Sequence, residues 1–257
     1  VLACVASEYI YTTITDQKIT IYDLSAVVTG MILALNLPCT FPYWKAALGG
    51  AFAIIIVKQL FGGLGQNFMN PALGARCFLA LSFAGNMTAF YPSDAKGVDA
   101  ATSATPLTAL KNLGESSSSL LDMFIGNHAG TIGETSVIAL LIGALYLTVR
   151  KIIDLRIPLT YIVVFGICIM LFNKSTDINF LAMQLCGGGL IFGAFFMATD
   201  YATSPITKSG RYIFGICLGL LTAIFRTFGN TAEGVSFAII FCNLLVPLIE
   251  KWSIPKA

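Results

Sequence analysis

Charged residues are scarce in this sequence. Only 11% of the 257 residues are Asp, Glu, Lys or Arg, whereas 56% are hydrophobic and the mean hydropathy is +0.82. Ordinary globular domains carry about 25% charged residues. A water-soluble fold of this length cannot bury so much apolar surface, so we expect a lipid bilayer around the chain. No cluster of Lys and Arg stands apart from the ends of the apolar runs, which excludes the charge pattern typical of nucleic-acid binding.

Metal-ligating patterns are also lacking. The chain has one histidine, His128, and seven dispersed cysteines without a CxxC pair. Most of these cysteines lie in apolar runs, where a free thiol behaves as a small hydrophobic group. One histidine cannot form a metal site alone. We therefore predict no metal site and expect His128 in a surface loop.

Long hydrophobic runs dominate the sequence. Several are nearer 15 residues than the roughly 20 that cross the hydrocarbon as a helix, so some helices are expected to be tilted, broken or re-entrant. The chain is predicted to be an all-α, polytopic integral membrane protein, a single membrane domain over 1–257 with about eight or more transmembrane or half helices. Residues 1–11 read like the end of a span, so we expect N-terminal spans before them. The eight apolar runs that follow are 22–37, 45–61, 71–85, 135–149, 157–172, 179–198, 211–228 and 234–250.

The basic residues suggest an orientation. If 150–156 is cytoplasmic, alternation of the spans places nine Lys and Arg on that side and five on the other, with Arg76 set aside inside a helix. The long loop 86–135 carries more acids than bases. The positive-inside rule therefore predicts that this loop is extracytoplasmic.

Two pairs of short patterns recur at a similar distance. Asn70-Pro71 is echoed by Ser204-Pro205, and Gly49-Gly50 by Gly187-Gly188. These echoes predict two pseudo-symmetric helical halves, 1–85 and 136–257. Such an arrangement is frequent in transporters, so a solute channel or permease with two broken-helix repeats is one alternative function, and a structural membrane anchor is another.

The predicted external loop contains the sequence Asp-Ala-Ala-Thr-Ser-Ala-Thr-Pro-Leu at 99–107. Pro106 pushes Thr105 toward extended geometry, and small neighbours leave the segment uncluttered. A threonine hydroxyl is a poor nucleophile unaided, so its covalent modification by a phosphate-linked cofactor would need an external transferase and an accessible segment. Asp99 could orient that segment. The competing interpretation is that Thr105 is simply the N-cap of a helix.

A second polar stretch lies between the apolar runs at 62–76. It lacks the third glycine of a dinucleotide-binding loop and follows no predicted strand, so that fold is excluded. The glycines indicate a tight turn, and Asn67 and Asn70 are expected to cap a helix that begins at Pro71. Arg76 falls inside that helix, where we expect a carboxylate such as Asp23 or Asp200, or a phosphate group, as its partner.

Two further polar sites flank predicted spans. Thr199 and Asp200 lie in the second half, in a turn that corresponds to the polar stretch 62–76 of the first half. The simpler interpretation of these two residues is a helix end followed by an Asx or Ser/Thr turn. Arg226 and Glu233 flank an external turn and are expected to form a local ion pair.

Four stretches give the chain a resemblance to a known family. Taken together and in order, they resemble the D subunit of the Rnf ferredoxin:NAD oxidoreductase complex and, more distantly, the B subunit of the sodium-pumping NADH:quinone oxidoreductase. The resemblance runs over essentially the whole chain. The stretches are 62–72, 99–107, 196–207 and 233–238, the last continuing to Asn243 and Pro247.

The resemblance implies that Thr105 is esterified by the phosphate of FMN through a flavin transferase. The surrounding motif residues are Asp99, Thr102, Ser103 and Ala104, with Ser103 standing where the family commonly has glycine. The family also carries a non-covalent riboflavin. Residues that can line its pocket are Asn67, Asn70, Arg76, Thr199 and Asp200.

The same resemblance implies a role and a place. The chain would relay electrons between ferredoxin and NAD sites on other subunits, with coupled Na⁺ or H⁺ transport, while the flavin supplies the redox chemistry. Its partners would be the A, B, C, E and G types of Rnf subunit. The location implied is a bacterial or archaeal cytoplasmic membrane, with the flavin loop on the extracytoplasmic side.

Overall fold

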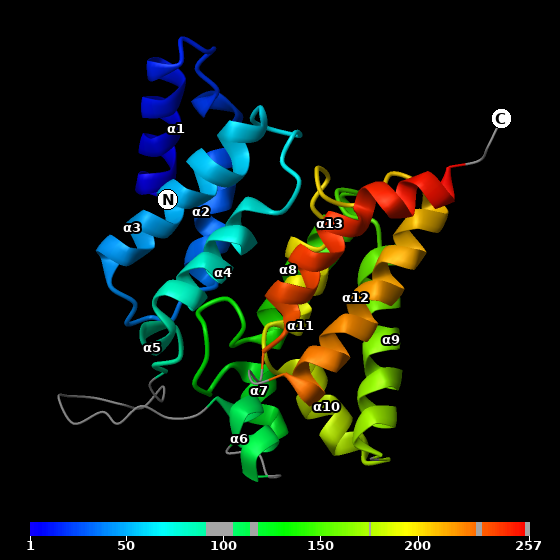
Figure 1. The fold of residues 1–257 in the computed structure, drawn as a ribbon. Helices are drawn as coiled ribbons and strands as arrows, with labels where there is room; N and C mark the ends of the chain where they lie inside the picture. The colour runs from blue at the N-terminus through cyan, green and yellow to red at the C-terminus, as the bar shows by residue number, and fades with distance from the viewer. Residues whose placement is uncertain (91–104, 114–117, 175, 230–232, 255–257) are drawn as a thin grey trace.

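The computed structural model describes residues 1–90, 105–113, 118–174, 176–229 and 233–254, and every regular element in them is helical (Figure 1). This confirms the all-α prediction, and each of the eight apolar runs contains a helix or a pair of helices. The helices are α1 (Leu2–Ile14), α2 (Ser25–Leu35), α3 (Tyr43–Phe52), α4 (Pro71–Ser82), α5 (Ala84–Met87), α6 (Pro106–Leu113), α7 (Leu120–Ile125), α8 (Val137–Val149), α9 (Arg156–Asn173), α10 (Ile178–Cys186), α11 (Leu190–Phe192), α12 (Lys208–Phe228) and α13 (Val235–Ser253).

Helices α1 to α5 gather on one side of the molecule and α8 to α13 on the other, with α6 and α7 at one end (Figure 1). The helix α3 continues through a π-helical stretch, Ala53–Lys58, and α11 continues through another, Gly193–Met197. Each π-helical stretch is followed by a polar turn and then by a helix. The glycine pairs differ, however, because Gly49 and Gly50 lie inside α3 whereas Gly187 and Gly188 interrupt a helix. The division into two related halves stays a prediction.

Four helices in the described part of the chain are long and apolar enough to cross a membrane: Tyr43–Phe61, Arg156–Asn173, Lys208–Phe228 and Val235–Ser253. The pair Ile178–Cys186 and Leu190–Met197 makes a fifth span if its bend of 60° is counted as a break within one span. Shorter apolar helices are α2, α4 and α8. This confirms the expectation that several of the apolar runs form short or broken helices.

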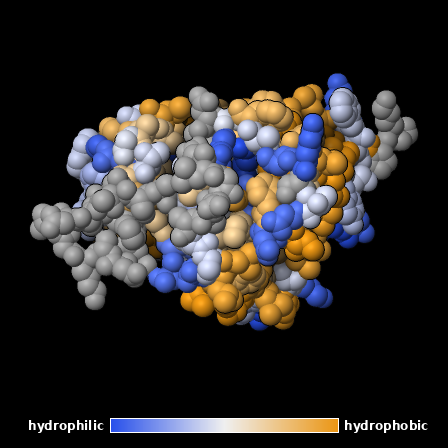
Figure 2. Space-filling model, turned by 90° about the horizontal axis from the view of Figure 1, so that it is seen from below, coloured by the Kyte–Doolittle hydropathy of each residue, from blue (hydrophilic) through white to orange (hydrophobic). Residues whose placement is uncertain are grey.

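The surface is consistent with a lipid solvent. On α9, large apolar side chains at every fourth position are more than half exposed, which places one helical stripe outward. Figure 2 shows hydrophobic surface over much of the flanks, with hydrophilic side chains in patches between. In water such a surface would cost free energy, whereas hydrocarbon tails cover it without penalty. The outward residues of α9 are Leu159, Val163, Ile167 and Leu171.

The largest core lies where α9 packs on α12. A Cβ added to Gly215 would come within 2.8 Å of Thr160, and one added to Gly219 within 2.8 Å of the Phe165 backbone. Small residues thus let the two helix backbones approach closely, which is how helices gain packing energy in a membrane. The Tyr161 and Thr222 hydroxyls hydrogen-bond across this contact at 2.6 Å.

Candidate functional site

The first polar turn connects α3 to α4 and has the predicted glycine geometry. Gly62, Gly63 and Gly65 have φ of 110°, 89° and 85°, values that favour glycine. Asn70 caps α4 as predicted, since its Oδ1 accepts from the N–H groups of Ala72 (3.0 Å) and Leu73 (3.3 Å). The expected capping role of Asn67 is wrong, because its amide donates to the Met69 carbonyl at 3.0 Å instead.

The second polar turn follows the π-helical stretch Gly193–Met197. Thr199 lies just after the C-cap Ala198, and its hydroxyl donates to the Phe195 carbonyl in the last helical turn at 2.7 Å. The Thr203 hydroxyl donates to Asp200 Oδ2 at 3.1 Å, closing the turn with a side-chain hydrogen bond. Burial raises the pKa of Asp200 above its ordinary value, against the opposing effect of the bond from Thr203.

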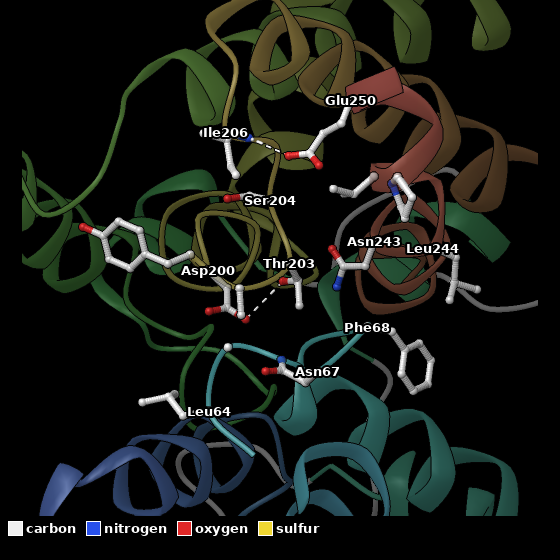
Figure 3. A pocket seen from close by; sticks show the side chains of 15 residues that line it. Leu64, Asn67, Phe68, Asp200, Thr203, Ser204, Ile206, Asn243, Leu244 and Glu250 are labelled. Atoms are coloured by element: carbon white, nitrogen blue, oxygen red, sulfur yellow. Dashed lines mark hydrogen bonds between the residues drawn. The ribbon is translucent and has the colours of Figure 1, made fainter. Parts of the chain in front are cut away.

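Asn243 of α13 joins the two turns. With its side-chain amide turned to the orientation in which both ends find partners, the oxygen accepts from the Asn70 N–H at 3.1 Å, and the nitrogen donates to the carbonyls of Thr203 (3.1 Å) and Ile239 (3.2 Å). Figure 3 shows Asn243 beside Thr203, with Asn67 and Asp200 close by. The sequence alone places Asn243 only in a family-like stretch, because its two partners lie in segments far away in the chain.

Two cavities meet at these turns, with volumes of about 710 Å³ and about 640 Å³. Asn67 and Asp200 line both, while Asn70 and Thr199 line only the cavity of 640 Å³. Four of the five residues predicted for a second flavin are therefore brought together. The apolar wall of the 640 Å³ cavity includes Ile32, Leu35, Phe192, Phe195 and Phe196.

Arg76, the fifth predicted residue, lies elsewhere and is not among the described residues that line either cavity. Its Nη2 is 2.5 Å from the carboxylate of Glu233, Nη1 donates to the Ser236 hydroxyl, and Nε donates to the Asn36 carbonyl at 3.4 Å. The expected pairing with Asp23 or Asp200 is wrong. The helix α4 packs against α13, and this packing gives Arg76 a carboxylate at the start of α13.

The expected local ion pair between Arg226 and Glu233 is also wrong. Arg226, on α12, instead caps the end of α10: Nη1 donates to the Gln184 carbonyl at 2.5 Å and Nη2 to the Gly187 carbonyl at 2.8 Å. Helix carbonyls at a C-terminus lack intrahelical partners and carry partial negative charge, so a guanidinium is a suitable cap.

A carboxylate lies at the other side of the same helix break. A Cβ placed on Gly189, the N-cap of α11, would be 3.2 Å from Glu134 Oε2, so the carboxylate contacts the break directly. Burial, followed by the negative charge of Glu233, raises the pKa of Glu134 to about 8. The nearby His128 is buried rather than on the surface as predicted. Its ring nitrogens lie 3.1 Å from the carbonyls of Ala129 and Thr135.

Thr105 immediately precedes α6. Its hydroxyl accepts from the Thr108 N–H at 3.3 Å and lies 2.8 Å from the Thr108 hydroxyl, which is N-cap geometry. The residue is only 5% exposed. The structure thus bears out the capping interpretation, and the expected accessibility of Thr105 is wrong for this arrangement. The other motif residues, Asp99, Thr102, Ser103 and Ala104, lie outside the described residues.

Known proteins match this chain over nearly its whole length. The model of the NQR2, RnfD, RnfE family matches residues 1–257. The chain belongs to the NQR2, RnfD, RnfE family. A relative from Acetobacterium woodii, named as the D subunit of a Na(+)-translocating ferredoxin:NAD(+) oxidoreductase complex, is 46% identical over 98% of this chain and 78% of its own. A relative from Clostridium ljungdahlii, named as the D subunit of a proton-translocating ferredoxin:NAD(+) oxidoreductase complex, is 41% identical over 99% of this chain and 80% of its own length. A third relative, from Stutzerimonas stutzeri, is named as the D subunit of an ion-translocating oxidoreductase complex. It is 38% identical over 91% of this chain and 75% of its own length.

One buried cluster in this member of the NQR2, RnfD, RnfE family was not predicted from the sequence. Glu8 of α1 is fully buried, and its Oε1 accepts from Lys58 Nζ (2.7 Å), Gln59 (2.8 Å) and Thr20 (2.8 Å). Lys58 is 2% exposed and also donates to Ser25 at 2.5 Å. It was one of the nine basic residues that the orientation argument placed on the cytoplasmic side, but it is buried inside the fold rather than in a loop. The sequence did contain a signal for this cluster: Glu8 and Lys58 are charged residues that each lie inside an apolar stretch. A charged residue inside a membrane helix implies a buried partner.

Proposed function

We propose that this chain is the D subunit of an ion-translocating ferredoxin:NAD oxidoreductase complex and that it relays electrons by means of bound flavin. The main support for this proposal is that the chain is 46% identical, over 98% of its length, to a relative that is named as such a subunit. The remaining complex subunits, of the A, B, C, E and G types, would hold the ferredoxin and NAD sites, and Na⁺ or H⁺ would be the coupling ion. The proposed location is the cytoplasmic membrane, with the segment before α6 on its outer side.

The covalent cofactor of the proposal is FMN, joined through its phosphate to Thr105 by a flavin transferase. After esterification the Thr105 oxygen can still accept from the Thr108 N–H, so the cap of α6 is compatible with the modified side chain. Because Thr105 is only 5% exposed, we expect attachment while α6 is undocked from the rest of the fold. FMN supplies one- and two-electron redox chemistry, while the chain positions it.

Replacement of Thr105 tests this attachment. In cells that co-express the flavin transferase, the parent protein should carry the added mass of one FMN and fluoresce on a denaturing gel, and Thr105→Ala should lose both signals completely. Thr108→Ala is the matched control, because it removes the neighbouring hydroxyl and should leave both signals in place. A parent protein without the added mass would contradict covalent attachment.

The second flavin of the proposal is a non-covalent riboflavin in the 640 Å³ cavity. Cavities of about 300 to 1,000 Å³ with mostly apolar walls and a few polar groups suit ligands of this size. The three phenylalanines of this wall offer apolar contact to a ring system. Asn67, Thr199 and Asp200 offer hydrogen-bonding groups at the polar end.

Filling each cavity separately tests this assignment. Val28 lines the 640 Å³ cavity and Val246 the 710 Å³ cavity. In the purified complex, Val28→Trp should lower the flavin released by denaturation, measured relative to the FMN retained on Thr105, whereas Val246→Trp should not. Loss with Val246→Trp alone would place the flavin in the other cavity, and no loss with either variant would contradict both placements.

The permease alternative finds less support. The broken helix α10–α11 resembles the discontinuous helices of transporters, whose carbonyl ends bind transported cations. Here Arg226 occupies that carbonyl end. The relatives that match nearly the whole chain are named as oxidoreductase subunits.

A further inference from the structure

The two cavities at the polar turns share part of their walls. Leu64, Asn67, Asp200, Tyr201 and Ala202 line both of them, and Leu64, Asn67 and Asp200 lie near one another in Figure 3. Two of the shared residues are largely exposed, Tyr201 by 73% and Leu64 by 63%. These two side chains therefore stand at the rim, where the shared wall reaches the surface of the protein.

Tyr201 reaches from this rim to the loop 150–155 between α8 and α9. Its hydroxyl donates to the carbonyl of Ile152, and Ile152 lines the 640 Å³ cavity and is exposed itself. Lys151 has a φ of 55°, and the N–H groups of Lys151 and Ile152 bond back to α8, which ends the helix here and leaves the Ile152 carbonyl to Tyr201. The edge between Tyr201 and Ile152 is the mouth of the 640 Å³ cavity.

Beside the mouth, the loop and the second polar turn are fixed to one helix by charged groups. Arg211 of α12 donates from Nη1 to the carboxylate of Asp154 in the loop, and from Nε to the Pro205 carbonyl in the turn at 3.2 Å. Asp154 also pairs with Arg156 at 3.0 Å. None of these four residues lines either cavity. The attachment is therefore charged and lies outside the cavities, whereas the bond from Tyr201 across the mouth is neutral and exposed.

We propose that Tyr201 is the gate residue of the 640 Å³ cavity: bonded to Ile152 it closes the mouth, and turned away it opens the cavity to water. One neutral hydrogen bond shifts such an equilibrium by only about two- to ten-fold, so the closed arrangement is favoured and still opens. Exposed side chains also change rotamer fast compared with the release of a ligand. Arg150 and Lys151 beside the mouth are exposed charges, which indicates that this end of α8 faces water.

The gate does not depend on what fills the cavity, whereas the identity of the ligand, riboflavin, rests on the proposed function. Elsewhere the cavity wall includes Val28 and Met31 of α2, apolar side chains that are 51% and 52% exposed. Such a surface suits hydrocarbon, and a ligand with several hydroxyl groups pays a large desolvation cost to cross hydrocarbon. The mouth at Tyr201 is therefore the entrance that suits riboflavin, and its closure would retain the bound flavin.

Thiol labelling measures the gate by a readout other than flavin. Thr29 lines the 640 Å³ cavity and is 9% exposed, so Thr29→Cys places a thiol in its wall. In the purified complex in lipid nanodiscs, a charged methanethiosulfonate should label this cysteine about two- to ten-fold faster when Tyr201→Phe removes the hydroxyl, and at least as fast with Tyr201→Ala. Tyr212→Phe is the matched control, because Tyr212 is exposed and lines neither cavity. The exposed native Cys39 serves as an internal reference for the reagent.

Release of riboflavin then tests the ligand. After dilution of the complex into flavin-free buffer, fluorescence of released riboflavin should appear about two- to ten-fold faster with Tyr201→Phe than with the parent or Tyr212→Phe. Faster labelling with unchanged release would support the gate and contradict only the proposed place of the flavin. Labelling at the parent rate in both Tyr201 variants overturns the gate, whatever the rate of release.

Discussion

Three buried charges in the described part of the chain are satisfied by groups of three different kinds. Glu8 has an ammonium and two neutral donors, Arg76 has a carboxylate, and Arg226 has main-chain carbonyls. All three arrangements lower the cost of holding a charge away from water. Glu134 differs, because burial, followed by the negative charge of Glu233, raises its pKa.

The raised pKa of Glu134 gives a prediction at the scale of one residue. Its pKa rises from 4.5 to about 8, so the folded protein holds a proton that the unfolded chain releases as pH increases over that range. The stability that this group contributes is present below the lower value and is lost as pH rises through the upper one. Glutamine stays neutral. The unfolding temperature of the Glu134→Gln complex should therefore fall less than that of the parent between about pH 6 and about pH 9.

The control for Glu134 is an exposed carboxylate. Asp16→Asn changes the same kind of charge on an exposed side chain and should reproduce the pH dependence of the parent. Identical pH profiles for the parent and Glu134→Gln would contradict the raised pKa.

At the scale of elements, the break between α10 and α11 organises the end of the molecule that carries α6. Gly188 and Gly189 have φ of 67° and 65°, the left-handed region that other residues adopt at a cost. The break exposes a carbonyl end to Arg226, whose positive charge matches the helix dipole there, and it places the carboxyl group of Glu134 beside the N-terminal end of α11. Leu107 of α6 packs directly on this break.

Replacement of Gly188 tests the packing of α6 on the break. A Cβ at Gly188 would lie 2.4 Å from Leu107 Cδ2 and 2.8 Å from Arg226 Nη2, in addition to the strain of a positive φ. Gly188→Ala should cost at least about 1–2 kcal/mol from the backbone alone and should speed amide exchange over 106–113. Gly85→Ala is the matched control, since its added Cβ would meet nothing within 4 Å. Unchanged exchange in Gly188→Ala would contradict the close contact.

At the scale of the whole molecule, two groups of helices meet around the cavities. The 640 Å³ cavity takes its wall from α2 and the first polar turn on one side, and from α8 and the second π-helical stretch on the other. Asn243 then joins both turns by hydrogen bonds. The first group is held together internally by the Glu8 cluster, which links α1, the start of α2 with the segment before it, and the end of the π-helical stretch Ala53–Lys58.

The Glu8 cluster can be tested by removing one charge and then both. Lys58→Met leaves Glu8 fully buried without its cation, and breaking such a pair should lower the free energy of unfolding by about 3–5 kcal/mol. The double variant Glu8→Gln with Lys58→Met removes both charges and should recover much of that loss. Lys18→Met, at an exposed position, is the control. Thermal unfolding of the purified complex measures all four proteins, and a single variant as stable as the double variant would contradict the pairing.

The turns show how far residue patterns predict a site. Asn70 before Pro71 predicted both the cap and the start of α4, because capping depends on residues within one helical turn. The polar turns at 62–70 and 199–205 were predicted from glycine, proline and short polar side chains for the same local reason. That Asn67, Asn70, Thr199 and Asp200 line a common cavity needed the packing of both helix groups.

Hydropathy, helix period and capping are properties of neighbouring residues, and the sequence by itself therefore determined the all-α membrane fold, the eight apolar runs that contain the helices and the positions of the polar turns. The partners of the buried charges were decided only by the tertiary structure. Arg76 pairs with Glu233, 157 positions away, rather than with Asp23 or Asp200, and Arg226 bonds to α10 rather than to nearby Glu233. The physical reason is that a charge in an apolar interior takes the polar group that helix packing brings within hydrogen-bond distance, and that packing depends on the whole chain.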